Sequence, residues 1–106
     1  MNHEPSIGAV PLGLRLLPWD SETGQPCFLG ADDPDGPVSR LADEIEAEQL
    51  QDAADVLEGA KAVLADQEAG EFALRQTLRA TTQVLRAVLR VADSRGARLW
   101  QRSDRS

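Results

Sequence analysis

The chain has 106 residues and a formal net charge of −7 at pH 7, and aromatic residues make up only 4% of it. This length fits one domain with a modest core, and the shortage of large side chains favours a core that a partner surface completes. The single cysteine, Cys27, excludes an intrachain disulfide, and no run approaches the ~20 apolar residues that span a bilayer. No basic leader precedes the first apolar residues, so we expect a soluble cytoplasmic protein without a membrane partner.

Charge is distributed unevenly along the chain. Residues 1–72 hold sixteen of the eighteen acidic residues and three basic ones, whereas residues 73–106 hold eight arginines and two aspartates. Such asymmetry indicates either charge complementarity inside the molecule or a basic segment with a partner of its own.

The first structural element expected is a β-hairpin or extended arm over residues 10–29, after a mobile tail at 1–9. Apolar residues recur at every second position, which is typical of a strand with one buried face. These residues are Val10, Leu12, Leu14 and Leu16. A polar, turn-forming stretch then leads into a short return strand at 26–29. A lone hairpin is unstable in water, so we expect it to lie on the helices that follow.

Two amphipathic helices are expected after a loop rich in proline and glycine. Residues 38–65 and 71–95 carry apolar residues at i+3 and i+4 spacing, and Gly96 is suited to end the second helix. The short connection at 66–70 predicts that the helices are antiparallel. The fold class is therefore mainly α: an N-terminal β-hairpin or extended arm, then an antiparallel two-helix hairpin. Residues 10–96 form a single domain in this interpretation, and residues 97–106 fray.

The second helix has the clearest pattern. Its heptad-spaced residues predict a seam that faces the first helix, and Leu85 at mid-seam is expected to be buried. The seam consists of Leu74, Leu78, Thr81, Leu85, Val88 and Ala92. Three further apolar residues, Val84, Leu89 and Val91, flank this seam and need cover. Either the hairpin covers them or a second copy of the chain does.

Four arginines form a stripe on the second helix: Arg75, Arg79, Arg86 and Arg90. One interpretation is that the stripe pairs with acidic residues on the first helix, placing Asp52 near Arg86 and Glu48 near Arg90. The other is that it binds the phosphates of a nucleic acid. The acidic net charge and the lack of aromatic residues on that face favour the internal pairing.

Four short stretches of sequence resemble a known group of proteins. They are Leu17-Pro18-Trp19, Gly24-x-Pro26-Cys27-x-Leu29, Ser39-Arg40-Leu41-Ala42-Asp43 and Ser94-Arg95-Gly96-Ala97-Arg98-Leu99. Together they resemble a set of short, uncharacterised actinobacterial proteins, and the similarity covers residues 17–99. The resemblance implies a bacterial cytoplasmic origin and no particular activity.

Residues for catalysis or metal binding are scarce. A tail cannot hold His3 beside Cys27 as a nucleophile–base pair requires, and zinc requires more ligands than the two provide. The acidic loop at 32–36 fails the spacing of an EF-hand, because Ala31 and Ala42 fall where calcium ligands are required. We therefore expect no catalytic, cofactor-binding or metal site, and no enzyme.

The function that this sequence predicts is a small non-catalytic protein–protein interaction or regulatory module. It is expected to self-associate through its helical hairpin as a homodimer with four helices. The alternative is a nucleic-acid-associated regulator that uses the arginine stripe. The candidate interaction surface comprises Trp19, Phe28, Val84, Leu89, Val91, Arg75, Arg79, Arg86 and Arg90.

Overall fold

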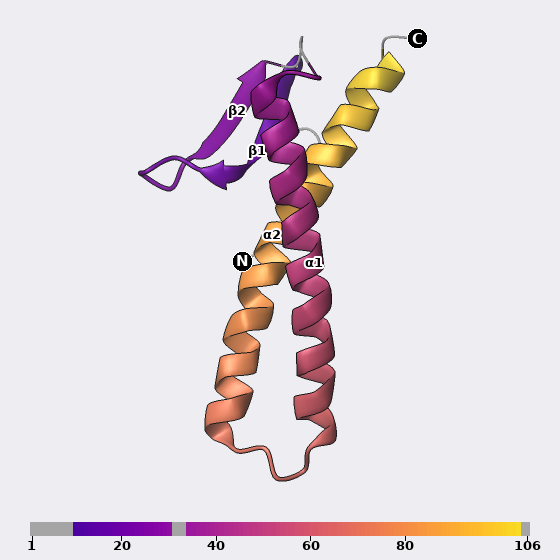
Figure 1. Ribbon diagram of the computed structural model, residues 1–106. Helices are drawn as coiled ribbons and strands as arrows, with labels where there is room; N and C mark the ends of the chain where they lie inside the picture. The colour runs from indigo at the N-terminus through magenta and orange to yellow at the C-terminus, as the bar shows by residue number, and fades with distance from the viewer. Residues whose placement is uncertain (1–9, 31–33, 105–106) are drawn as a thin grey trace. The chain divides into compact units, whose positions relative to one another are not determined.

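The computed structural model describes residues 10–30 and 34–104, with side chains as far as Gln101. The elements follow the order β1 (Leu14–Asp20), β2 (Pro26–Gly30), α1 (Pro37–Ala65) and α2 (Glu71–Asp104) (Figure 1). The fold is mainly helical, with an antiparallel β-hairpin followed by two helices that pack against each other. The predicted fold class is thereby confirmed, whereas the tail predicted at 1–9 lies outside the described residues.

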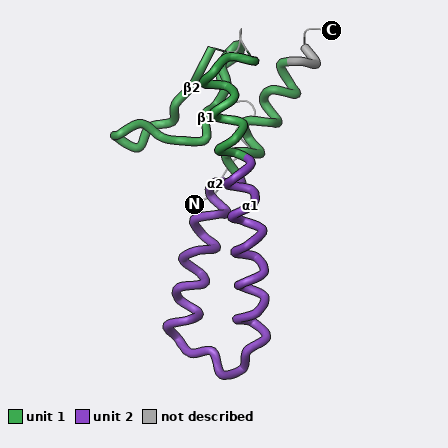
Figure 2. Tube along the Cα trace, in the orientation of Figure 1, with its two compact units in different colours: residues 1–46, 89–106 green, residues 47–88 purple. Residues whose placement is uncertain are grey.

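The chain divides into two compact units (Figure 2). Unit 1 comprises residues 1–46 and 89–106, so it holds the β-hairpin, the beginning of α1 and the last part of α2. Unit 2 comprises residues 47–88, which form the rest of both helices and the turn between them.

The β-hairpin forms as the alternating pattern predicts. Its strands pair antiparallel, with Arg15 opposite Leu29 and Leu16 opposite Phe28. The amide of Ser21 donates to the carbonyl oxygen of Gln25 at 2.8 Å and closes the turn. Gly24 in this turn has a φ of 81°, a left-handed conformation that glycine adopts without strain.

Burial along β1 differs from the predicted alternation. Arg15, Leu16, Leu17 and Pro18 are all buried, while Leu12 is exposed. Leu16 packs with Val10 and with Ala97 of α2 in the apolar core of unit 1. Neighbouring residues of a strand point to opposite faces. The strand is therefore covered on both faces. Arg15 can be buried on one of them, although it is charged, because it binds Ser39 and Glu46 of α1.

Helix α2 continues through Gly96 to Asp104, so the predicted end at Gly96 is wrong. A capping glycine adopts a positive φ, and Gly96 does not. Instead, the hydroxyl of Ser94 donates to the carbonyl oxygen of Leu16 at 2.9 Å. The side-chain amide of Gln101 donates to the carbonyl oxygen of Pro11 at 3.3 Å. These bonds to the hairpin hold the helical continuation in place.

In unit 2, α2 turns a different stripe toward α1 from the one predicted. Leu74, Leu78 and Leu85 are exposed, so the expectation that Leu85 is buried is wrong. The partly buried residues of α2 in unit 2 are Ala73, Thr77, Ala80, Thr81, Val84, Ala87 and Val88. Their spacing also follows a heptad, and most of them are small. The helix therefore has two adjacent heptad stripes, and the one with smaller side chains lies inside, where they allow the closer approach.

Replacing Ala42 with leucine should destabilise unit 1. Ala42 is fully buried, and adding volume to a packed site lowers the free energy of unfolding by ~1–3 kcal/mol. Urea unfolding followed by circular dichroism measures the change. The matched control is Ala62→Leu, on an exposed part of the same helix, where a change below ~0.5 kcal/mol is expected. An unchanged midpoint for Ala42→Leu would contradict this packing.

Candidate interaction surface

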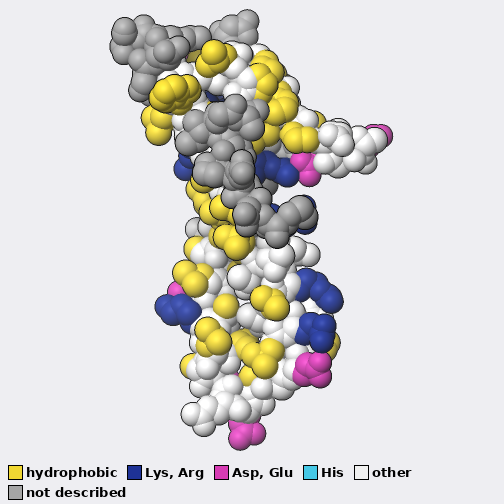
Figure 3. Space-filling model, turned by 180° about the vertical axis from the view of Figure 1, so that it is seen from behind, with side chains coloured by type: hydrophobic (Ala, Val, Ile, Leu, Met, Phe, Trp, Pro, Cys, Tyr) yellow, Lys and Arg dark blue, Asp and Glu magenta, His cyan; other side chains and the backbone are white. Residues whose placement is uncertain are grey.

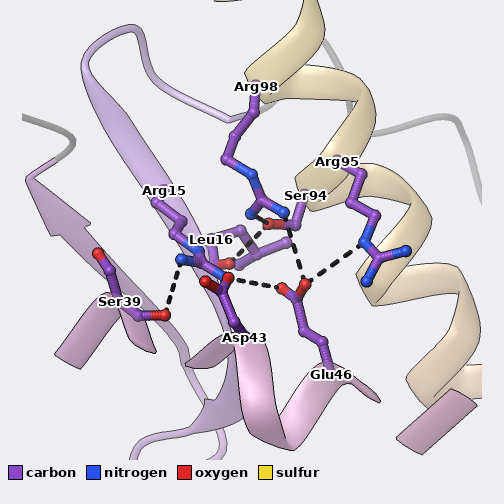
Figure 4. Close-up of polar contacts among 8 residues, drawn as sticks. All are labelled: Arg15, Leu16, Ser39, Asp43, Glu46, Ser94, Arg95 and Arg98. Carbon is purple, nitrogen blue, oxygen red and sulfur yellow. Dashed lines mark hydrogen bonds and ion pairs between the residues drawn. The ribbon is translucent and has the colours of Figure 1, made fainter. Parts of the chain in front are cut away.

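Unit 1 contains a buried cluster of charged side chains centred on Glu46, which is 1% exposed. Its carboxylate lies 3.4 Å from a guanidinium nitrogen of Arg15 on β1. The same carboxylate lies 3.5 Å from nitrogens of Arg95 and Arg98 on α2 (Figure 4). One carboxylate on α1 therefore binds both the strand and the second helix.

Arg15 completes the cluster from the strand. Its guanidinium donates to the carbonyl oxygen of Ser39 at 3.1 Å and to Oδ1 of Asp43 at 2.6 Å (Figure 4). Arginine suits this position because its planar group offers several donors in a fixed arrangement. Its Nε atom is buried and has no partner among the described residues, so the cluster is not fully satisfied.

The surroundings of Arg98 in the cluster shift its pKa. Burial lowers the pKa of Arg98, and the neighbouring positive charge of Arg15 lowers this pKa further. The carboxylate of Glu46 opposes both effects by attraction and by a hydrogen bond. Arginine normally titrates far above neutral pH, so Arg98 keeps its charge and binds Glu46 as a cation.

The sequence analysis did not identify this cluster, although one signal for it was present. Arg15 is the one charged residue in the apolar run from Val10 to Leu17. Glu46 follows Ala42 by four positions, so it falls on the buried stripe of α1. A charge inside the apolar pattern of a strand indicates a buried ion pair, because a lone buried charge is too costly. The stripe that holds Glu46 also contains Ser39 and Gln49, so it is not apolar in sequence and did not single out Glu46.

The structure separates the four arginines of the predicted stripe. Arg90 lies 2.8 Å from Oδ1 of Asp20 on β1, and Arg75 lies 3.1 Å from Glu71 of its own helix. Arg79 and Arg86 are exposed, and neither has an ion-pair partner among the described residues. The predicted pairing of α1 acids with this stripe is therefore not found within the described part of the chain.

The apolar residues predicted as a flank do not form an exposed surface. Val91 is buried, and Val84 and Leu89 are partly buried. Val91 lies one helical turn before Ser94, whose hydroxyl bonds to β1, so this side of α2 faces the hairpin. Of the predicted aromatic contacts, Phe28 is exposed and Trp19 is partly buried.

Five leucines form most of the exposed apolar surface of unit 2, and we term them the leucine face. They are Leu57, Leu64, Leu74, Leu78 and Leu85, which are 58%, 80%, 48%, 68% and 53% exposed. At 3.6 residues per turn, the leucines of each helix lie beside the stripe that faces the other helix. Because the helices are antiparallel, the leucines of α1 and those of α2 lie on the same side of the hairpin. Figure 3 shows hydrophobic side chains gathered over the helical hairpin on this side.

Unit 2 lacks an interior of its own. All residues from 47 to 88 are described, and none of them is buried. Two helices hide only one stripe each, whereas stable helical bundles enclose a core between more than two helices. The leucine face is therefore the surface across which unit 2 would gain a core.

Other features of the sequence give no site in the structure. Cys27 is partly buried in β2, while His3, Asp32 and Asp33 lie outside the described residues. Within residues 10–30 and 34–104, no group of three or more potential metal ligands is found. No helix in this part of the chain has the length and apolar character to cross a membrane.

The chain matches no protein-family model, and comparisons with curated proteins and with solved structures gave no match. Its function must therefore be argued from its own residues.

Replacing Glu46 with glutamine should strongly destabilise unit 1. The buried guanidinium of Arg15 would be left with Asp43 alone as its counter-charge, and Arg98 would lose its carboxylate partner. Breaking a buried pair in this way lowers the free energy of unfolding by about 3–5 kcal/mol. The control is Glu44→Gln on the same helix, which is exposed and should change stability by less than ~0.5 kcal/mol. Equal urea midpoints for the two variants would show that the cluster does not stabilise the fold.

Proposed function

We propose that this chain is a non-catalytic interaction module that self-associates through the leucine face. The observation that carries the proposal is the exposure of five leucines on a unit in which no residue is buried. Exposed apolar patches of this kind mark interaction sites on proteins. The face replaces Val84, Leu89 and Val91 as the proposed contact surface, because those residues are wholly or partly covered.

The size of the leucine face supports a dimer. Fully burying a leucine contributes ~1.5–3 kcal/mol relative to leaving it exposed, and these side chains are about half to four-fifths exposed. Ten such leucines in a symmetric pair contribute on the order of 10 kcal/mol. Association must offset about 4–15 kcal/mol of lost translational and rotational freedom, so the leucines can supply most of the free energy that a stable dimer requires, and the helix surface beside them must supply the rest.

The spacing of the leucines supports a helical partner, and a second copy supplies one. Leu74, Leu78 and Leu85 with Thr81 keep the heptad spacing by which helices interdigitate. Two copies joined through this face form four helices around a closed core, an arrangement that symmetric dimers commonly use.

Nucleic-acid binding by the arginine stripe is less well supported. Arg75 and Arg90 are already paired with carboxylates, which leaves Arg79 and Arg86 to attract phosphates. A labelled duplex at low salt provides the test, and we expect no binding. Binding that weakens steeply as salt rises would favour the nucleic-acid alternative instead.

Leu85→Glu should convert the dimer to a monomer without loss of helix. It places a charge on the leucine face, where the partner would bury it. Sedimentation velocity at micromolar concentration measures the mass, and far-UV circular dichroism measures the helix content. Phe72→Glu is the control, because Phe72 is 76% exposed but lies on the opposite side of α2, so this variant should remain dimeric. A monomeric wild type, or a Leu85→Glu variant that associates as well as the wild type, would overturn the proposal.

A further inference from the structure

Two leucine faces can pair symmetrically in two ways. The orientation inferred below rests on the proposed self-association. The twofold axis lies between the faces, either along the helices or across them. An axis along the helices packs α1 on α2 of the second copy and brings both turns, at 66–70, to the same end. An axis across the helices packs α1 on α1 and α2 on α2, with the turns at opposite ends.

The helices of unit 2 carry opposite charges. The part of α1 at 47–65 has four acidic residues and one lysine, a net charge of −3. The part of α2 at 71–88 has three arginines and one glutamate, a net charge of +2.

At about 100° per residue, Glu48, Asp52 and Asp55 lie on the side of α1 away from the leucines. Glu58 and the arginines of α2, in contrast, lie near the outer edges of their helices. Packed helices lie about 8–10 Å apart, within roughly one Debye length at physiological salt, so the charges at these edges act most strongly across the interface.

We propose that two copies pair with their turns at the same end, so that α1 of each copy lies against α2 of the other. This arrangement sets −3 against +2 along both contacts. The alternative sets −3 against −3 and +2 against +2, which like-charge repulsion disfavours. The charges of the two helices thereby determine the orientation, whereas the leucines supply most of the affinity.

Arg79 gains a specific role in this arrangement. It is exposed and has no ion-pair partner among the described residues. Glu58 and Arg79 lie at similar distances from the turn, on the sides of their helices that face away from each other. In the same-end dimer, Arg79 of one copy is level with Glu58 of the other. Glu58 is well exposed, and its ion pair among the described residues is with Lys61 of its own helix, at 3.1 Å, so it is accessible to this contact.

A disulfide across the turns tests the orientation directly. Gln67→Cys in a Cys27→Ser background puts one thiol in the exposed turn of each copy. Mild oxidation should link most of the protein as a covalent dimer, because the turns are adjacent. With the turns at opposite ends, the thiols are about 30 Å or more apart, the length of the paired helices, and no link forms within the dimer. Adding Leu85→Glu to the same variant is the control, and it should abolish the link.

Charge reversal gives an independent readout that needs no cysteine. Glu58→Arg and Arg79→Glu should each weaken the dimer roughly tenfold at low salt, since a symmetric dimer contains each contact twice. The two changes together should restore the affinity. In the opposite-end arrangement each position lies near its own counterpart in the second copy, so a single reversal exchanges one like-charged pair for another and leaves the affinity nearly unchanged, a result that would overturn the proposal.

The outcomes separate the orientation from the self-association. A dimeric wild type whose Gln67→Cys variant does not crosslink, and whose affinity neither reversal weakens, refutes the same-end arrangement and leaves the leucine face in place. A wild type that stays monomeric at all concentrations refutes both.

Discussion

In unit 1, the carboxylate of Glu46 on α1 joins β1 and α2. A buried carboxylate without partners is costly by several kcal/mol, and here guanidinium groups from β1 and α2 surround it. Arg15 also binds Ser39 and Asp43, so a shift of the strand by one residue would turn its guanidinium to the opposite face and leave charge unpaired. The apolar core beside this cluster is small, and its buried members among the described residues are Val10, Leu16, Leu17, Ala42, Val91 and Ala97. Charge pairing therefore determines the register of β1, because so few apolar residues would specify this register only loosely.

Unit 2 is built on the opposite principle. Its ion pairs among described residues, Glu58 with Lys61 and Glu71 with Arg75, each lie within one helix and are exposed. Such pairs contribute little to stability, ~0–1 kcal/mol each. The two helices meet through small residues and leave the larger leucines outside. Unit 1 thus has buried residues and a buried ion-pair cluster within one chain, whereas unit 2 is left with apolar surface that a second copy would bury.

Secondary structure could be predicted well from this sequence because it depends on local pattern. The alternation from Val10 to Leu16 and the i+3/i+4 spacing of both helices placed the hairpin and α1 close to their observed bounds. Packing was predicted less well. Two adjacent heptad stripes on α2 satisfy the same periodicity, and the pattern does not tell whether Leu85 or Val84 faces α1. Gly96 resembles a helix end in sequence, but the bond from Ser94 to Leu16 depends on tertiary contact and outweighs it.

The most direct test of the leucine face is hydrogen–deuterium exchange measured over a range of protein concentrations. Burial by a second copy should slow exchange across residues 71–88 as concentration rises, since association stabilises the helical state by mass action. The amides of unit 1 around Glu46 should be protected to the same degree at every concentration. Protection of 71–88 that does not change with concentration would contradict the central claim, because it would mean that no second copy covers this face.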